Sequence, residues 1–168
     1  YFDKIYVVND DRLHNYSGEY YSKITTDLIK EIEPEIVLIG ATSLGRDLAP
    51  QIASTLQTGL TADCTALDIN EQGKLAATRP TFGGKLMATI LSKNNPQMAT
   101  VRPHVITTDY NAVLKDTQYI EFIAQIDGIE PHVKLLDIVK KEISAGIEDA
   151  EIIVAGGRGV KDNFSANL

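Results

Sequence analysis

Two uninterrupted apolar runs, separated by one amphipathic helix pattern, most constrain what this chain can fold into. The runs are KIYVV at residues 4–8 and IVLIG at residues 36–40, and both are typical of strands buried on two faces. Between them, apolar residues recur at every fourth position through residues 20–32, on one face of a helix that Pro34 ends. Strand, helix and apolar strand in this order predict an α/β fold with a parallel sheet.

The remaining chain predicts a second helix and several further strands. Leu48, Ile52 and Leu56 are four residues apart and predict a helix that runs to about Gly59. Two strands are expected around a turn at residues 71–74, and further short strands at residues 85–92, 97–103 and 118–127. The segment HVKLLDIVKKEIS fits the periods of both helix and strand. We therefore predict a three-layer α/β fold with a mostly parallel sheet and added β-hairpins.

Charge and composition restrict the function. The formal net charge is −7, which argues against nucleic acid or an anionic membrane as the main partner, and no apolar run reaches the ~20 residues of a membrane-spanning helix. Cys64 is the only cysteine, so no internal disulfide forms, and we expect it to be buried. His14, His104 and His132 lie far apart, so no metal site is expected. Nothing brings a nucleophile, a base and an orienting group together, so we do not predict an enzyme.

The segment GATSLGRD at residues 40–47 follows a predicted parallel strand. The carboxyl end of such a strand is where open α/β sheets bind ligands. Thr42 and Ser43 suit either contact with a phosphate group or capping of the next helix. Both interpretations stay open from the sequence alone.

The segment TRPTFGGKLMATI contains two adjacent glycines before a lysine. Leu86 stands where a phosphate-binding P-loop requires Ser or Thr, so we reject a P-loop and expect a bulge or turn. Arg79 and Arg102 each precede a proline. A structural salt bridge is the simplest role for either arginine, and an interface role is the alternative.

The segment EIIVAGGRGV places a glycine-rich loop after an apolar run at residues 151–155, which we predict to be a strand. Gly156, Gly157 and Gly159 allow the backbone to approach a ligand closely. Arg158 adds a permanent cation among them. The loop therefore suits a planar group that is anionic or accepts electrons.

Four stretches together resemble the α subunit of electron-transfer flavoprotein, in the same order and at similar spacing. They are GATSLGRDLAPQIASTLQTGLTADCTALDI, TRPTFGGKLMATI, PQMATVRPHV and EIIVAGGRGV, and the resemblance runs from about Asp3 to Val160. It implies an N-terminal domain with an adenine-nucleotide α-hydrolase-like fold over residues 1–150, without its first strand–helix unit. Residues 151–168 would then be the truncated start of the FAD-binding domain.

The resemblance also implies a function. The whole heterodimer of α and β subunits would carry electrons through FAD from acyl-CoA or related dehydrogenases, as in fatty-acid β-oxidation, to an acceptor. Arg158, flanked by Gly156, Gly157 and Gly159, would contact the FAD, which we expect in the full heterodimer and not in this chain alone. The segment at residues 40–47 would bind no AMP. The expected location is the bacterial cytoplasm, with the mitochondrial matrix as the alternative.

Two other functions remain as alternatives. A stand-alone nucleotide-binding α/β module of the universal-stress-protein type would bind ATP or AMP tightly by itself. A pure interaction domain would be monomeric and free of ligand in the absence of a partner.

Overall fold

The computed structural model describes residues 2–107, 116–139, 147, 150–157 and 159. The chain divides into two compact units, Tyr1–Val133 and Lys134–Leu168. Within the described residues, no helix combines the length and the apolar character needed to cross a membrane.

The first unit is built on a three-stranded parallel sheet. Its order is β2 (Ile36–Gly40), β7 (Gln97–Val101) and β3 (Leu60–Cys64), so the last of these strands in the chain lies at the centre. Both outer strands run parallel to β7. A second parallel pair joins β1 (Lys4–Val7) to β8 (Gln118–Glu121). The predicted α/β class with mostly parallel pairing is confirmed.

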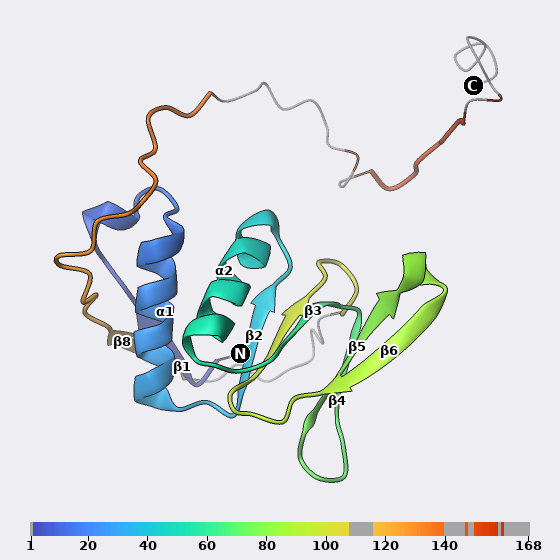
Figure 1. The fold of residues 1–168 in the computed structure, drawn as a ribbon, viewed down its shortest axis with the longest axis horizontal. Coiled ribbons are helices and arrows are strands. Elements are labelled where there is room, and N and C mark those ends of the chain that lie inside the picture. The colour runs from blue at the N-terminus through green and yellow to red at the C-terminus, as the bar shows by residue number, and fades with distance from the viewer. Residues whose placement is uncertain (1, 108–115, 140–146, 148–149, 158, 160–168) are drawn as a thin grey trace. The chain divides into compact units, whose positions relative to one another are not determined.

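Two helices lie side by side next to this sheet (Figure 1). They are α1 (Gly18–Ile32) and α2 (Ser43–Thr55), and a short 3-10 helix, η1 (Asp11–Leu13), precedes them. Ile29, Ile52 and Met98 are buried together, and apolar side chains of β2 and β3 pack around them. This cluster joins both helices to one face of the sheet.

An antiparallel sheet forms the third layer. It consists of β4 (Ala66–Ile69), β5 (Leu75–Thr81) and β6 (Leu86–Leu91), and the 3-10 turn η2 (Phe82–Gly84) connects the last two strands. A second core cluster lies between the two sheets and contains Cys64, Leu75, Ala77 and Ala99. Met98 and Ala99 are successive residues of β7, so their side chains point to opposite faces. The central strand is therefore buried on both faces, as its apolar sequence requires.

The structure corrects several predictions in this unit. The strand predicted at residues 118–127 ends at Glu121. The two strands expected to be buried on both faces are not, since Val7 and Leu38 are exposed by 43% and 52%. Residues 60–81 form three strands instead of two, because the chain leaves the parallel sheet after Cys64 and Thr65 donates its backbone N–H to Thr78. Helix α2 ends at Thr55, and the left-handed position after it falls on Gln57, with φ of 53°, instead of on Gly59. The backbone N–H of Thr58 donates to Ala53 and closes this helix end.

The second unit contains no α-helix or strand among its described residues. The strand predicted at residues 151–155 is absent, and Ile152, Ile153 and Val154 are exposed by 84%, 57% and 59%. A strand is stable only when a neighbouring strand pairs with its backbone. No such neighbour occurs in the described part of the chain, so the apolar sequence alone does not produce the strand.

Candidate functional site

The loop at residues 40–47 is a tight capping turn. The side-chain oxygen of Thr42 accepts a hydrogen bond of 3.1 Å from the backbone N–H of Gly45, in the first turn of α2. Gly45 is buried, and a Cβ added there would lie 1.9 Å from the carbonyl oxygen of Gly40. Of the two interpretations left open by the sequence, the structure shows the capping role for Thr42, while Ser43 is the first residue of the helix.

An irregularity in β3 sets the position of Asp63 next to this loop. The pairing of β3 with β7 shifts between Thr61 and Cys64, and Asp63 has a φ of 62°. Its backbone N–H donates to the hydroxyl of Thr100 at 2.8 Å. Asp tolerates the left-handed conformation better than most residues, and a bulge of this kind redirects a side chain. The Asp63 carboxylate is therefore presented at the carboxyl end of the sheet.

Two arginines from different elements bind this carboxylate. Arg102, which directly follows β7, donates from Nε to Oδ1 at 3.1 Å and from Nη2 to Oδ2 at 2.6 Å. Arg46, in the first turn of α2, donates from Nη2 to Oδ1 at 3.3 Å and from Nε to the carbonyl of Ala41 at 2.9 Å. The structural salt bridge predicted for Arg102 is confirmed. Its bidentate geometry is the strongest form of an arginine–carboxylate contact.

The arginines change the titration of Asp63. The hydrogen bond from Arg102 lowers the pKa of the carboxyl, the positive charges of Arg102, Arg46 and Arg79 lower it further, and burial opposes them. Asp63 is therefore a carboxylate at neutral pH, and its charge stabilises the contact with Arg102.

Arg79, on β5, differs from the other two arginines. Its Nε is enclosed by the protein and has no hydrogen-bond partner in the described part of the chain. No ion pair to an acidic residue is found for it there, so the salt bridge predicted for Arg79 is not formed. Its charge acts on Asp63 only at longer range.

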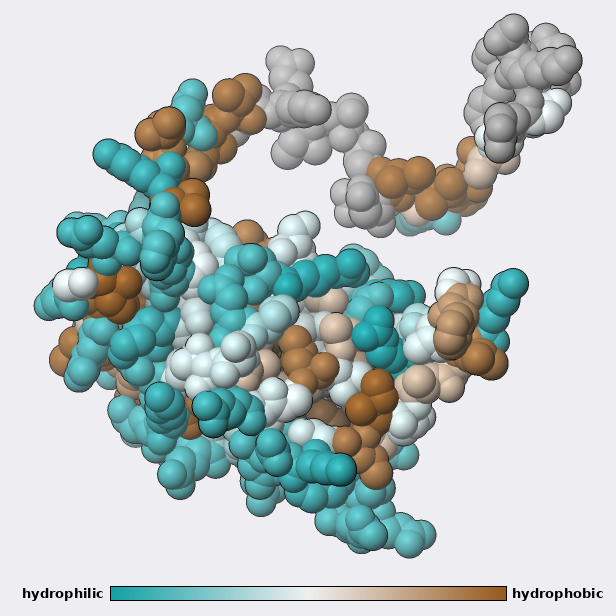
Figure 2. Space-filling model, in the orientation of Figure 1, coloured by the Kyte–Doolittle hydropathy of each residue, from teal (hydrophilic) through white to brown (hydrophobic). Residues whose placement is uncertain are grey.

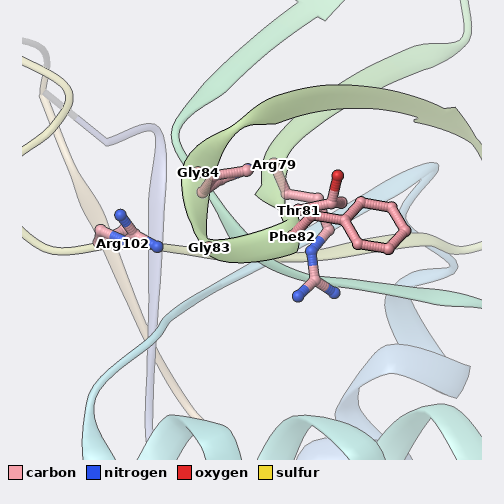
Figure 3. Close-up of a pocket in the computed structure, with 7 residues that line it drawn as sticks. Arg79, Thr81, Phe82, Gly83, Gly84 and Arg102 are labelled. Atoms are coloured by element: carbon pink, nitrogen blue, oxygen red, sulfur yellow. The ribbon is translucent and has the colours of Figure 1, made fainter.

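Arg79 lines two hollows at this end of the molecule. One, of about 590 Å³, lies against the turn between β5 and β6 and is also lined by Arg102. The other, of about 300 Å³, is lined by Arg46, Asp63 and Thr100 as well as by Arg79. Figure 3 shows the Arg79 guanidinium extending from the hairpin below Phe82. Charged groups from four elements, namely α2, β3, β5 and the end of β7, thus line these hollows.

The two glycines of the hairpin form the predicted turn. Gly83 and Gly84 have φ values of 67° and 86°, which glycine adopts without strain. Phe82, which precedes them, is 81% exposed. This end of the hairpin therefore presents an aromatic ring beside accessible backbone.

The loop that the sequence predicts to contact a cofactor lies in the other unit. Arg158 lies outside the described residues. Gly156, Gly157 and Gly159 are exposed, and a Cβ added at Gly157 or Gly159 would meet no atom within 4 Å. Glycines have the conformational freedom that a close approach to a ligand needs, and the contact of this loop with a cofactor stays a prediction.

The remaining titratable candidates are structural or dispersed. Cys64 is fully buried, and this burial raises the pKa of its thiol. Among the residues that the structure describes, no group of three or more His, Cys, Asp or Glu side chains could hold a metal ion.

Comparison with known proteins identifies the family. The sequence profile of the electron transfer flavoprotein domain matches residues 1–127. The chain belongs to the electron transfer flavoprotein family. The match covers all the strands and helices described above, so the resemblance seen in the sequence is confirmed.

Named relatives of this electron transfer flavoprotein domain are similar over nearly its whole length. The electron transfer flavoprotein subunit alpha of Thermoanaerobacterium thermosaccharolyticum is 50% identical over 160 residues, which are 94% of this chain and 48% of that protein. The protein of the same name from Clostridium acetobutylicum is 45% identical over 96% of this chain and 50% of its own length. The LctC subunit of the lactate dehydrogenase (NAD(+),ferredoxin) of Acetobacterium woodii is 40% identical over 95% and 38%. The chain thus spans about half the length of the first two relatives and 38% of the third.

Proposed function

We propose that this chain is the N-terminal part of an electron-transfer flavoprotein α subunit and works as an electron carrier, not as an enzyme. The observation that carries the proposal is the 50% identity over 160 residues to a protein named as such a subunit. The relatives' names favour this function over a stand-alone nucleotide-binding module. Residues 1–150 would then form the N-terminal domain, and residues 151–168 would begin the FAD-binding domain.

The cofactor that we propose is FAD, which supplies the redox chemistry when it is bound. The loop of Gly156, Gly157, Arg158 and Gly159 would hold it, with the guanidinium beside the flavin ring. The absence of a Cβ at the three glycines, which lets a backbone come close to a ligand, supports this assignment. A fixed cation there would stabilise the anionic reduced flavin more than the neutral oxidised form.

The partner that we propose is an electron-transfer flavoprotein β subunit. A group of large apolar side chains on the β5–β6 hairpin supports an interface there (Figure 2), namely Phe82, Leu86, Met87, Ile90 and Leu91. Phe82 is 81% exposed and Leu86 is 59% exposed. Leu86 and Ile90 alternate with Met87 and Leu91 along β6, so they expose apolar surface on both faces of the hairpin. Exposed apolar surface of this extent is typical of regions that a partner covers.

The electron donor that we propose is an acyl-CoA or related dehydrogenase, in the bacterial cytoplasm. One relative is named as a subunit of a lactate dehydrogenase, so a dehydrogenase outside fatty-acid β-oxidation is the second candidate. Bacterial relatives support the proposed location.

Substitution of Arg158 by Ala in the full-length heterodimer tests the proposal. Loss of the cation should lower the flavin reduction potential and weaken FAD retention. A charged hydrogen bond is worth on the order of 1–3 kcal/mol, and about 59 mV corresponds to a tenfold change for a one-electron couple, so the decrease should be tens of millivolts or more. A redox titration measures it, with the nearby Lys161→Ala as the charge-matched control and circular dichroism as the folding control. Equal potentials and FAD contents in the wild type and Arg158→Ala would refute the flavin contact.

A further inference from the structure

The positive charge of Arg79 lacks the partner that the other arginines of this region have. Its Nε is shielded by the protein and unpaired within the described residues. Polar groups enclosed in this way almost always have a partner, so an unpaired one needs a physical explanation. Arginine keeps its proton at any ordinary pH and cannot relieve the unfavourable position by becoming neutral.

Asp63 does not serve as this partner in the structure, where its carboxylate accepts from Arg102 and Arg46 and makes no hydrogen bond with Arg79 Nε. Oδ1 accepts from Arg102 and Arg46, and Oδ2 accepts from Arg102 at 2.6 Å. Among the described residues that line the two hollows, Asp63 is the sole acidic residue against Arg46, Arg79 and Arg102. The region therefore has two positive charges in excess, on a chain whose formal net charge is −7.

The location makes this excess charge accessible to a ligand. The hollows share Arg79 and measure about 590 Å³ and 300 Å³. They lie where β3 and β7 end, at the edge of the sheet that binds ligands in open α/β folds. Arg46 lies in the first turn of α2, and the N-terminus of this helix contributes a partial positive charge to the same region. Figure 3 shows that the terminal nitrogens of Arg79 point away from the strand that carries them.

We propose that the two hollows that share Arg79 form a binding site for the phosphate group of a small molecule, centred on Arg79, with Arg46 lining one hollow and Arg102 the other. A dianionic phosphate matches the excess of two charges, and its oxygens match the terminal N–H groups of the Arg79 guanidinium. The enclosed Nε stays out of a ligand's reach, and the negative charge of the phosphate would offset its unpaired position. The residues of this site lie between positions 46 and 102 of the sequence, so none of them belongs to the glycine loop at residues 156–159. It is independent of the flavin assignment and of the proposed electron transfer.

Thermal unfolding and calorimetric titration of the purified protein with inorganic phosphate test the proposal, with chloride at the same ionic strength as the reference. A ligand that binds only the folded state raises the unfolding temperature in a concentration-dependent way. We expect saturable binding of phosphate at about 1 mM or below, and at least about tenfold weaker binding by Arg79→Gln. The control Lys93→Gln removes the same charge from an exposed position and should bind as the wild type does.

A second variant, a second ligand and the chloride reference complete the test. Arg79→Lys keeps the charge and loses the paired N–H groups, so it should bind phosphate with intermediate affinity; it decides the question if Arg79→Gln does not fold by circular dichroism. AMP that binds as tightly as phosphate identifies the phosphate group as the feature recognised. Tighter AMP binding that is lost in Arg79→Gln extends the site to a nucleotide. Stabilisation by chloride equal to that by phosphate, or unchanged phosphate binding in Arg79→Gln, would overturn the proposal.

Discussion

Substitution of Asp63 by Asn tests whether the carboxylate holds the end of the parallel sheet together. Asn has nearly the same shape and tolerates the φ of 62° at this position, so the change removes mainly the charge. It weakens the bidentate contact with Arg102, of 2.6 and 3.1 Å, and the longer contact with Arg46. The amide N–H₂ would also face a guanidinium that only donates.

The size of the effect follows from the exposure of the two partners. The side chain of Asp63 is 24% exposed and that of Arg102 is 39% exposed, so water screens part of the attraction. A charged hydrogen bond contributes about 1.5–3 kcal/mol and an exposed ion pair about 0–1 kcal/mol. We therefore expect the free energy of unfolding to fall by about 1–2 kcal/mol, and Tm by roughly 3–8 °C.

The stability difference between wild type and Asp63→Asn should depend on pH. The lowered pKa of Asp63 means that its contribution is fully present above the unfolded-state pKa of about 4 and is lost as pH falls through the folded-state value. Denaturant unfolding of wild type and Asp63→Asn should differ at neutral pH and converge in acid. Glu71→Gln, at an exposed turn, is the matched control and should show neither effect. Equal stability at neutral pH, or a difference that persists in acid, would refute the reasoning.

Two further changes test the packing around the same loop. Gly45→Ala places a Cβ 1.9 Å from a backbone oxygen that cannot move away, so unfolding should occur at a much lower denaturant concentration, whereas Gly40→Ala meets only a methyl group at 3.8 Å and should be tolerated. Tyr16→Phe removes a hydroxyl that donates to Asp47 at 2.6 Å, and chemical unfolding should show a loss of about 0.5–1.5 kcal/mol. Burial and this hydrogen bond raise the pKa of Tyr16 above its unfolded-state value of about 10. The free energy of unfolding of the wild type should therefore decrease as the pH rises above about 10, and the advantage of the wild type over Tyr16→Phe should disappear. Equal denaturant midpoints for Gly45→Ala and Gly40→Ala, or for wild type and Tyr16→Phe, would contradict these expectations.

The main elements could be predicted because their patterns are local. The strand at residues 36–40 was predicted with the bounds that the structure has, since four successive apolar residues lie between Glu35 and Gly40. Helix α1 was predicted from its apolar spacing and from Pro34. Its N-cap residue Ser17 makes no side-chain capping hydrogen bond, and its hydroxyl donates to Glu19.

The candidate site depends on contacts that no local pattern contains. Asp63 and Arg102 are 39 residues apart, and they meet because β3 and β7 are neighbours and because a bulge turns Asp63 toward the strand ends. Thr100 fixes that bulge from the adjacent strand. The proline after Arg79 and Arg102 singled out both arginines, but the sequence did not indicate that one of them would be left unpaired.

The strand predicted at residues 151–155 failed for a related reason. An apolar run defines a strand only when another strand satisfies its backbone, and none of the described residues does so here. The same dependence on a neighbour applies to the glycine loop that follows, whose proposed ligand is a flavin shared with another subunit.

The flavin content of the full-length protein, co-expressed with its β subunit, tests the central claim most directly. The account predicts a yellow heterodimer with about one FAD per α subunit, bleached by reductant and restored by oxidant, while these 168 residues purified alone remain colourless. A stable heterodimer that contains no flavin after incubation with excess FAD would contradict the account.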